Sequence, residues 1–130
     1  MSSLNDAMRI SASGLSTERF RLDVISSNIA NANSVGVNGQ DPYRRRDVSV
    51  IGGPDGVKIG GVVEDQAPFR VVHEPGNPNA DGNGNVSYSN VEPVQEMVNM
   101  MGASRAYEAN VAAFNSAKGM INSALTIGKV

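Results

Sequence analysis

The chain has 130 residues, of which 40% are hydrophobic and only 5% are aromatic. This length predicts one domain, or one small domain carried on helical arms. A net charge of −2 gives no electrostatic reason to expect nucleic acid or an anionic membrane as partner. The lack of cysteine excludes disulfides, thiol nucleophiles and cysteine metal sites. No window approaches the roughly 20 apolar residues of a transmembrane helix, so we expect none.

Residues 4–33 predict a long N-terminal helix. Large apolar residues recur every seven positions in two rows, and Ser11 and Glu18 interrupt the second row. The rows are Met8, Leu15, Leu22 and Ile29, and Leu4, Ile25 and Ala32. Gly14 and the serines around it weaken this helix, so we expect it to depend on packing. The N-terminus lacks the basic and apolar regions of a secretory signal, and we expect no cleavable leader.

The segment 34–93 has a different composition, because all six prolines and most of the glycines lie in it. Short runs of alternating or β-branched residues predict four or five strands. These runs lie at 43–50, 57–59, 62–65, 69–72 and 86–88. The run Gly52–Gly56 predicts a tight turn after the first strand. With few aromatic residues, the segment is a small β-rich module with a modest core.

Residues 94–127 predict a second long helix, because they contain no proline and repeat in heptads. One row is Met97, Val111 and Leu125, and the other is Met100, Tyr107, Phe114 and Ile121. A flanking row of small residues would let another backbone approach closely; it consists of Ala103, Asn110, Ala117 and Ala124. A helix of this kind is typically contacted on several sides.

The sequence therefore predicts an α+β fold, in which two long terminal helices pair as an antiparallel coiled coil and a small β-rich module lies between them. We expect residues 1–33 and 94–130 to form the two helices of a coiled-coil core domain, and 34–93 to form the module. A helical hairpin that stands alone is the simpler alternative. Two helical arms around a small module suit a subunit that assembles with others.

No motif in the chain predicts an active site. The glycine-rich stretch 52–61 lacks the ending and the following helix of a phosphate loop. Residues 81–92 begin like a calcium loop, but Val86 stands where glycine is required, which leaves a calcium-binding module as a weak alternative. His73 has no partner nucleophile and no further metal ligands. We expect no catalytic residue, no cofactor and no metal site.

The arginine run Arg44–Arg46 has two readings. Three like charges followed by Asp47 favour a solvated strand edge that discourages unwanted pairing. The alternative is a contact with an acidic protein surface.

Several strings of residues resemble the signatures of the axial proteins of the bacterial flagellum. Ser26–Gly36 is similar to their N-terminal signature, and Glu96–Val111 is similar to their C-terminal one. Strings in the middle resemble the proximal members of the flagellar basal-body rod protein family; they are Pro42–Val48, Gly56–Ile59, Val63–Asp65 and Glu74–Asp81. Val37 departs from the pattern, since many axial proteins carry an aromatic residue there.

This resemblance implies a structural subunit of the proximal rod of the flagellar basal body, and no enzyme. Its terminal helices would assemble into the inner wall of a hollow, torque-transmitting shaft that spans the periplasm. The implied partners are other rod subunits, copies of itself and the flagellar type III export apparatus. Nucleic acid, a small-molecule substrate and direct membrane insertion are not implied. A cytoplasmic adaptor or export chaperone that binds partner helices is the alternative from a different class.

The signatures and the apolar rows together predict an assembly interface. It consists of Leu15, Leu22, Asn28, Ile29, Asn31, Met97, Met100, Tyr107, Asn110, Val111, Phe114 and Ile121.

Overall fold

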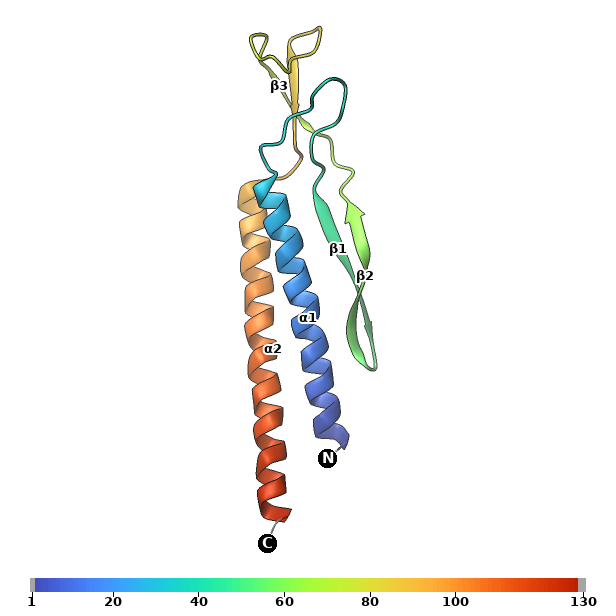
Figure 1. Cartoon of the computed structure of the whole chain (residues 1–130), viewed down its shortest axis with the longest axis vertical. Coiled ribbons are helices and arrows are strands. Elements are labelled where there is room, and N and C mark those ends of the chain that lie inside the picture. Colours follow the sequence, from blue (N-terminus) through green and yellow to red (C-terminus); the bar gives the residue numbers. More distant parts are fainter. Residues whose placement is uncertain (1, 129–130) are drawn as a thin grey trace. The chain divides into compact units, whose positions relative to one another are not determined.

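The computed structural model describes residues 2–128 and has an α+β fold, as predicted (Figure 1). The helix α1 spans Ser2–Ala30 and α2 spans Pro93–Gly128. The strands between them are β1 Arg46–Gly53, β2 Gly56–Glu64, β3 Arg70–His73 and β4 Asn85–Tyr88. No helix among these residues is both long and apolar enough to cross a membrane.

Several element bounds differ from the sequence-based ones by one to three residues; the first strand, for example, spans Arg46–Gly53 rather than 43–50. The helix α1 ends at Ala30 rather than near residue 33, because the signature asparagines continue into a turn in which the Ser34 N–H donates to the Asn31 carbonyl. The two runs expected at 57–59 and 62–65 form the single strand β2, since Gly60 and Gly61 continue it. The predicted turn is confirmed, and Gly56 begins β2 at a φ of 108° that favours glycine.

The strands form two separate two-stranded sheets. Strands β1 and β2 pair in one sheet across the turn at residues 54–55. Strands β3 and β4 pair antiparallel in the other, with Arg70 opposite Tyr88 and His73 opposite Asn85. The segment after α1 joins this second sheet, because Val35 forms a bridge to Tyr88.

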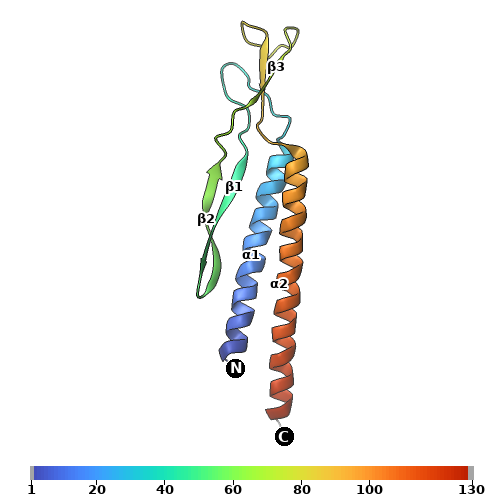
Figure 2. The ribbon, with the colours of Figure 1, turned by 180° about the vertical axis from the view of Figure 1, so that it is seen from behind.

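The chain divides into two compact units, and each contains part of both helices. The first unit comprises residues 1–22, 48–61 and 101–130, and the second comprises 23–47 and 62–100. In each unit a stretch of α1 lies beside a stretch of α2 (Figures 1 and 2). Asn28 contacts Glu96, and Gly14 contacts Asn110, so residue numbers fall along α1 as they rise along α2. The predicted antiparallel pairing is therefore confirmed. The division into segments at 33/34 and 93/94 stays a prediction.

The buried line of α2 is the flanking row of small residues rather than either apolar row. Ala103 and Ala117 are buried, and Glu96 lies one heptad before Ala103 and is fully buried. On α1 the buried residues also include small or polar ones: Ser11, Gly14, Thr17 and Asn28. A Cβ added at Gly14 would lie only 2.7 Å from the amide of Asn110, so the two backbones approach closely there. Small residues permit this approach, and many of the larger apolar side chains of α2 remain half-buried or exposed.

Candidate assembly surface and its polar junction

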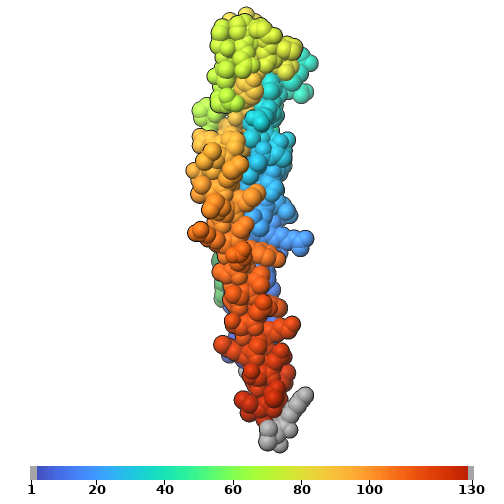
Figure 3. Space-filling model, turned by 90° about the vertical axis from the view of Figure 1, so that its left-hand side faces the viewer, coloured from blue at the N-terminus to red at the C-terminus, as the bar shows by residue number. Residues whose placement is uncertain are grey.

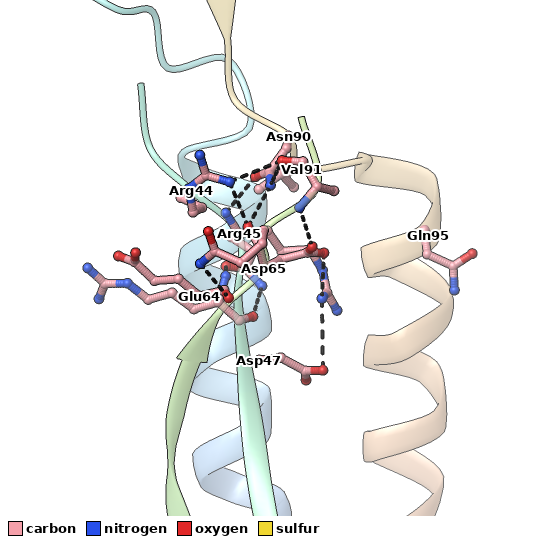
Figure 4. A network of polar contacts seen from close by, with 12 residues as sticks. Arg44, Arg45, Asp47, Glu64, Asp65, Asn90, Val91 and Gln95 are labelled. Carbon is pink, nitrogen blue, oxygen red and sulfur yellow. Dashed lines mark hydrogen bonds and ion pairs between the residues drawn. The ribbon is translucent and has the colours of Figure 1, made fainter. Parts of the chain in front are cut away.

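A cluster of polar side chains lies in the second unit, where α1, β1 and α2 meet (Figure 4). We call it the junction and define it as Asn28, Arg45 and Glu96. The Arg45 Nε donates to Glu96 Oε1, and Asn28 Nδ2 donates to Glu96 Oε2 at 3.3 Å. The Glu96 residue is 0% exposed, whereas the side chain of Arg45 is 19% exposed. The buried carboxylate of α2 is thus bound by side chains from two other segments.

Asn28 uses both ends of its side-chain amide. Its Oδ1 accepts the Arg46 N–H at 3.0 Å and the Tyr43 hydroxyl at 2.8 Å. Its Nδ2 donates to the Arg46 carbonyl at 2.8 Å as well as to Glu96. Asn28 therefore acts toward the start of β1 as a neighbouring strand would, by pairing with the N–H and the C=O of one residue.

The guanidinium of Arg45 has further acidic neighbours at the rim of the junction. Its Nη1 lies 3.4 Å from Asp65 and 3.9 Å from Asp47. Burial acts to lower the pKa of Arg45, but the hydrogen bond and charge of Glu96, together with Asp47 and Asp65, raise the pKa above its usual value. The Arg45 backbone N–H also donates to Asn90 Oδ1 at 2.7 Å. Breaking such a buried pair by removing one partner typically costs about 3–5 kcal/mol.

The arginine run does not form the solvated edge that its charges predict. Arg44 donates to the carbonyls of Asp65 and Ala67 at 2.9 and 3.0 Å, and its guanidinium lies 4.2 Å from the centre of the Phe69 ring. Arg45 belongs to the junction. Only Arg46 is exposed, with its guanidinium 5.6 Å from the Tyr43 ring centre. Two of the three arginines therefore join segments within the chain.

The second sheet and its loops contain the residues considered above as possible metal ligands. Asp81 Oδ1 accepts the N–H groups of Asn83 and Asn85 at 2.8 and 2.9 Å, so this carboxylate closes a turn. The exposed His73 ring lies 3.2 Å from Asn85 Oδ1. Among residues 2–128 no group of three or more acidic or histidine side chains is placed to hold a metal ion.

Glu74 and Tyr88 are linked in the same sheet. Both Glu74 oxygens accept the Tyr88 hydroxyl, at 3.0 and 2.9 Å. Hydrogen bonds from Asn77 and Tyr88 lower the pKa of Glu74, and the bond to Glu74 raises the pKa of Tyr88. These contacts hold β4 against the loop that follows β3.

Among the described residues, α2 carries several large apolar side chains that are more than half exposed. Near its start we define the α2 patch as Val94, Met97 and Val98, which are 76%, 53% and 57% exposed. Further along, Met101, Met120, Leu125 and Ile127 are also exposed. Figure 3 shows most of α2, in orange to red, facing the viewer with no other segment over it. Val94, Met97, Val98 and Met101 share one helix face by their spacing, and such a group is typical of a contact surface rather than of scattered exposure.

The predicted interface residues fall into three groups. Asn28 is buried and bound within the chain, whereas Asn31 and Met97 are exposed. The others are half-buried along the helices: Leu15, Leu22, Ile29, Met100, Tyr107, Asn110, Val111, Phe114 and Ile121. Sequence reasoning missed Val94 and Val98, although their spacing with Met97 and Met101 is that of one helix face. It also missed the pairing of Arg45 with Glu96, because the arginine run and the C-terminal signature do not mark these two residues as partners.

Comparison with known proteins adds independent information. Residues 8–36 match the family described as flagella basal body rod protein, and residues 83–127 match the C-terminal family of the flagellar basal body rod FlgEFG proteins. The chain is 48% identical over 127 residues to the flagellar basal-body rod protein FlgC of Salmonella typhimurium, covering 92% of this chain and 94% of that protein. It is 39% identical over 145 residues to the FlgC of Bacillus subtilis, covering 95% and 97% of the two chains. The FlgC of Borreliella burgdorferi is 35% identical over 147 residues, with the same coverage.

Proposed function

The chain belongs to the flagellar basal-body rod protein family, and from its similarity to FlgC proteins we propose that it is a proximal-rod subunit that assembles through its terminal helices. Membership of this family makes the chain a structural component of the flagellar basal body and not an enzyme. The position in the proximal rod, the use of the helices and the transmission of torque are the proposal.

The observation that best supports this proposal is that α2 buries small residues and exposes larger apolar ones. The contact with α1 uses small and polar residues such as Ala103 and Ala117, and the larger apolar residues remain outside. Burying a large apolar side chain contributes about 1.5–3 kcal/mol, so a side chain that is half exposed retains roughly half of this for a later contact. A helix with such a face is completed when neighbouring chains cover it. Open helical assemblies supply these neighbours, because each subunit uses different patches toward different copies.

Partners and route follow from the same assignment. The neighbours would be other rod subunits and further copies of this chain. The subunit would reach its place in the periplasm-spanning rod through the flagellar type III export apparatus. The hollow shaft that it helps to form would then transmit torque.

The substitution Val98→Glu tests the surface. Val98 lies in the α2 patch and is 57% exposed, so a charge there leaves the fold of the single chain intact and blocks burial against a neighbour. We expect the free energy of unfolding of the purified variant to lie within about 0.5 kcal/mol of that of the parent. In cells whose only copy is Val98→Glu, we expect basal bodies without the subunit and a loss of motility.

Gln95→Glu is the matched control, because it adds the same charge to α2 at an exposed position that is already polar. This variant should keep motility. Motile cells carrying Val98→Glu would contradict the proposal. A parent protein that stays in the cytoplasm and is absent from purified basal bodies would favour the adaptor or chaperone alternative.

A further inference from the structure

The contact between α1 and α2 does not by itself select one register. Gly14 faces Asn110, and one heptad to either side of Asn110 stand Ala103 and Ala117, both small and both buried. A slip of seven residues would therefore place Gly14 against an alanine without a steric penalty. Heptad repeats built from small residues are tolerant of such slips, since each repeat presents nearly the same surface.

The junction responds to a slip in the opposite way. Asn28 and Gly14 lie two heptads apart on α1, as do Glu96 and Asn110 on α2, so one register satisfies both contacts. A slip in one direction would bring Glu96 opposite position 35, beyond the end of α1 at Ala30. A slip in the other direction would bring it opposite Arg21, whose guanidinium is held by both oxygens of Glu18 at 3.1 Å.

Either slip also separates Glu96 from Arg45, because the backbone next to Arg45 is bound to α1 and not to α2. Its neighbour Arg46 is bound to Asn28 through both the N–H and the C=O. The buried carboxylate would then lose its cation, and an uncompensated buried charge is strongly unfavourable.

We propose that the junction sets the register of the helix pair: Arg45 and Asn28 select the one alignment of α1 and α2 in which the buried Glu96 is paired. These are positioning residues, which act on the alignment of α1 and α2 and not on any ligand. Buried polar groups that set the register of a coiled coil are a known use of such pairs in general. The inference concerns the single chain and does not depend on the proposed place in the rod.

Engineered cysteines measure the register directly, since the chain contains no other thiol. A Cβ at Gly14 lies 2.8 Å from the side-chain carbon of Asn110, so the pair Gly14→Cys with Asn110→Cys is close enough for a disulfide. The pairs Gly14→Cys with Ala103→Cys and Gly14→Cys with Ala117→Cys report the two slipped registers, and both carry Asn110→Ala so that the cysteine at position 14 meets no clash in the native register. The rate of disulfide formation in the purified full-length chain is followed for each pair under one oxidant.

In the parent background we expect the in-register pair to form at least about tenfold faster than either slipped pair. In the double variant Arg45→Met with Glu96→Met, which replaces both charges by apolar groups, we expect this preference to fall to about threefold or less. Thermal unfolding, measured on the same proteins, should change little. A loss of register without a loss of stability separates a positioning role from a merely structural one.

Glu18→Gln with Arg21→Gln is the matched control, because it removes the same two charges from a half-exposed pair on α1. It should keep the tenfold preference. If the methionine variant loses its helical circular dichroism, Arg45→Gln with Glu96→Gln takes its place and is expected to give the same loss of preference. A preference that survives removal of the junction, or that is absent from the parent, overturns the proposal.

Discussion

At the scale of single residues, Asn28 shows how a signature position can serve the interior of the chain. It is 0% exposed, and its amide makes four hydrogen bonds to the start of β1, to Tyr43 and to Glu96. Asn31, three residues later, is exposed, and its side-chain amide donates to the Ser27 carbonyl. Two asparagines of one motif thus have different physical roles.

Asn28→Asp should be strongly destabilising although it preserves the shape of the side chain. The substitution replaces a donor by an acceptor that faces the Arg46 carbonyl and the Glu96 carboxylate, and it buries a second negative charge. We expect a loss of at least about 3 kcal/mol at neutral pH in urea unfolding followed by circular dichroism. For the control Asn31→Asp, the free energy of unfolding should stay within about 1 kcal/mol of that of the parent. Equal effects of the two substitutions would contradict this account of the junction.

At the scale of elements, the turn between β1 and β2 lies against α1 within the first unit. The Val57 N–H donates to Ser13 Oγ at 3.1 Å, while Ser13 Oγ donates to the Ile10 carbonyl at 2.6 Å. A Cβ added at Gly56 would clash with Ser13 Oγ and lie 3.2 Å from its Cβ. The Arg9–Asp55 ion pair nearby is exposed on both sides, so it contributes little. Glycine at position 56 is therefore what lets this turn reach the helix.

Gly56→Ala should weaken this contact for two reasons that a control can separate. The positive φ of 108° costs an alanine about 1 kcal/mol, and the clash with Ser13 adds roughly 1–3 kcal/mol. Gly39→Ala meets the first cost alone, since Gly39 has a φ of 77° and no atom within 4 Å of an added Cβ. Chemical denaturation should show Gly56→Ala to be the more destabilising of the two. Hydrogen exchange at the Val57 amide should rise only in Gly56→Ala, and an unchanged rate would count against the contact.

At the scale of the whole molecule, the chain buries small and polar residues between its helices and leaves many large apolar ones outside. A chain that functioned alone would gain stability by the opposite arrangement, because apolar burial is the main favourable term in folding. The arrangement is understandable in a subunit whose core is completed by its neighbours, as is proposed here for the rod.

Two glycines of α2 allow a test of whether the stability of the single chain is limited by the needs of assembly. Gly102 and Gly119 are exposed in mid-helix, and an added Cβ at either meets no atom within 4 Å. In the free chain, alanine at each position should therefore stabilise the helix by about 0.5–1 kcal/mol, measured by thermal unfolding. If neighbouring subunits approach these positions closely, the same substitutions should reduce motility. Gly14→Ala is the contrast, since its Cβ would clash with Asn110 within the chain and should give no such gain.

The sequence by itself determined the elements and the family. Heptad spacing and the absence of proline predicted both helices, the run Gly52–Gly56 predicted the turn, and the two terminal signatures indicated a flagellar axial protein. These features are local, so the residues that cause them are neighbours in the chain.

Only the tertiary structure decided which face of α2 lies inside and which side chains meet at the junction. Periodicity shows that a helix has a repeated face, but it does not show which row of that face is buried. This depends on how closely a second backbone can approach, and the close approach at Gly14 lets the row of small residues on α2 be the buried one. Arg45 and Glu96 lie 51 positions apart, and no pattern in the sequence marks them as partners. Their pairing follows from the path of the chain between α1 and α2, because burial of one charge makes the other necessary.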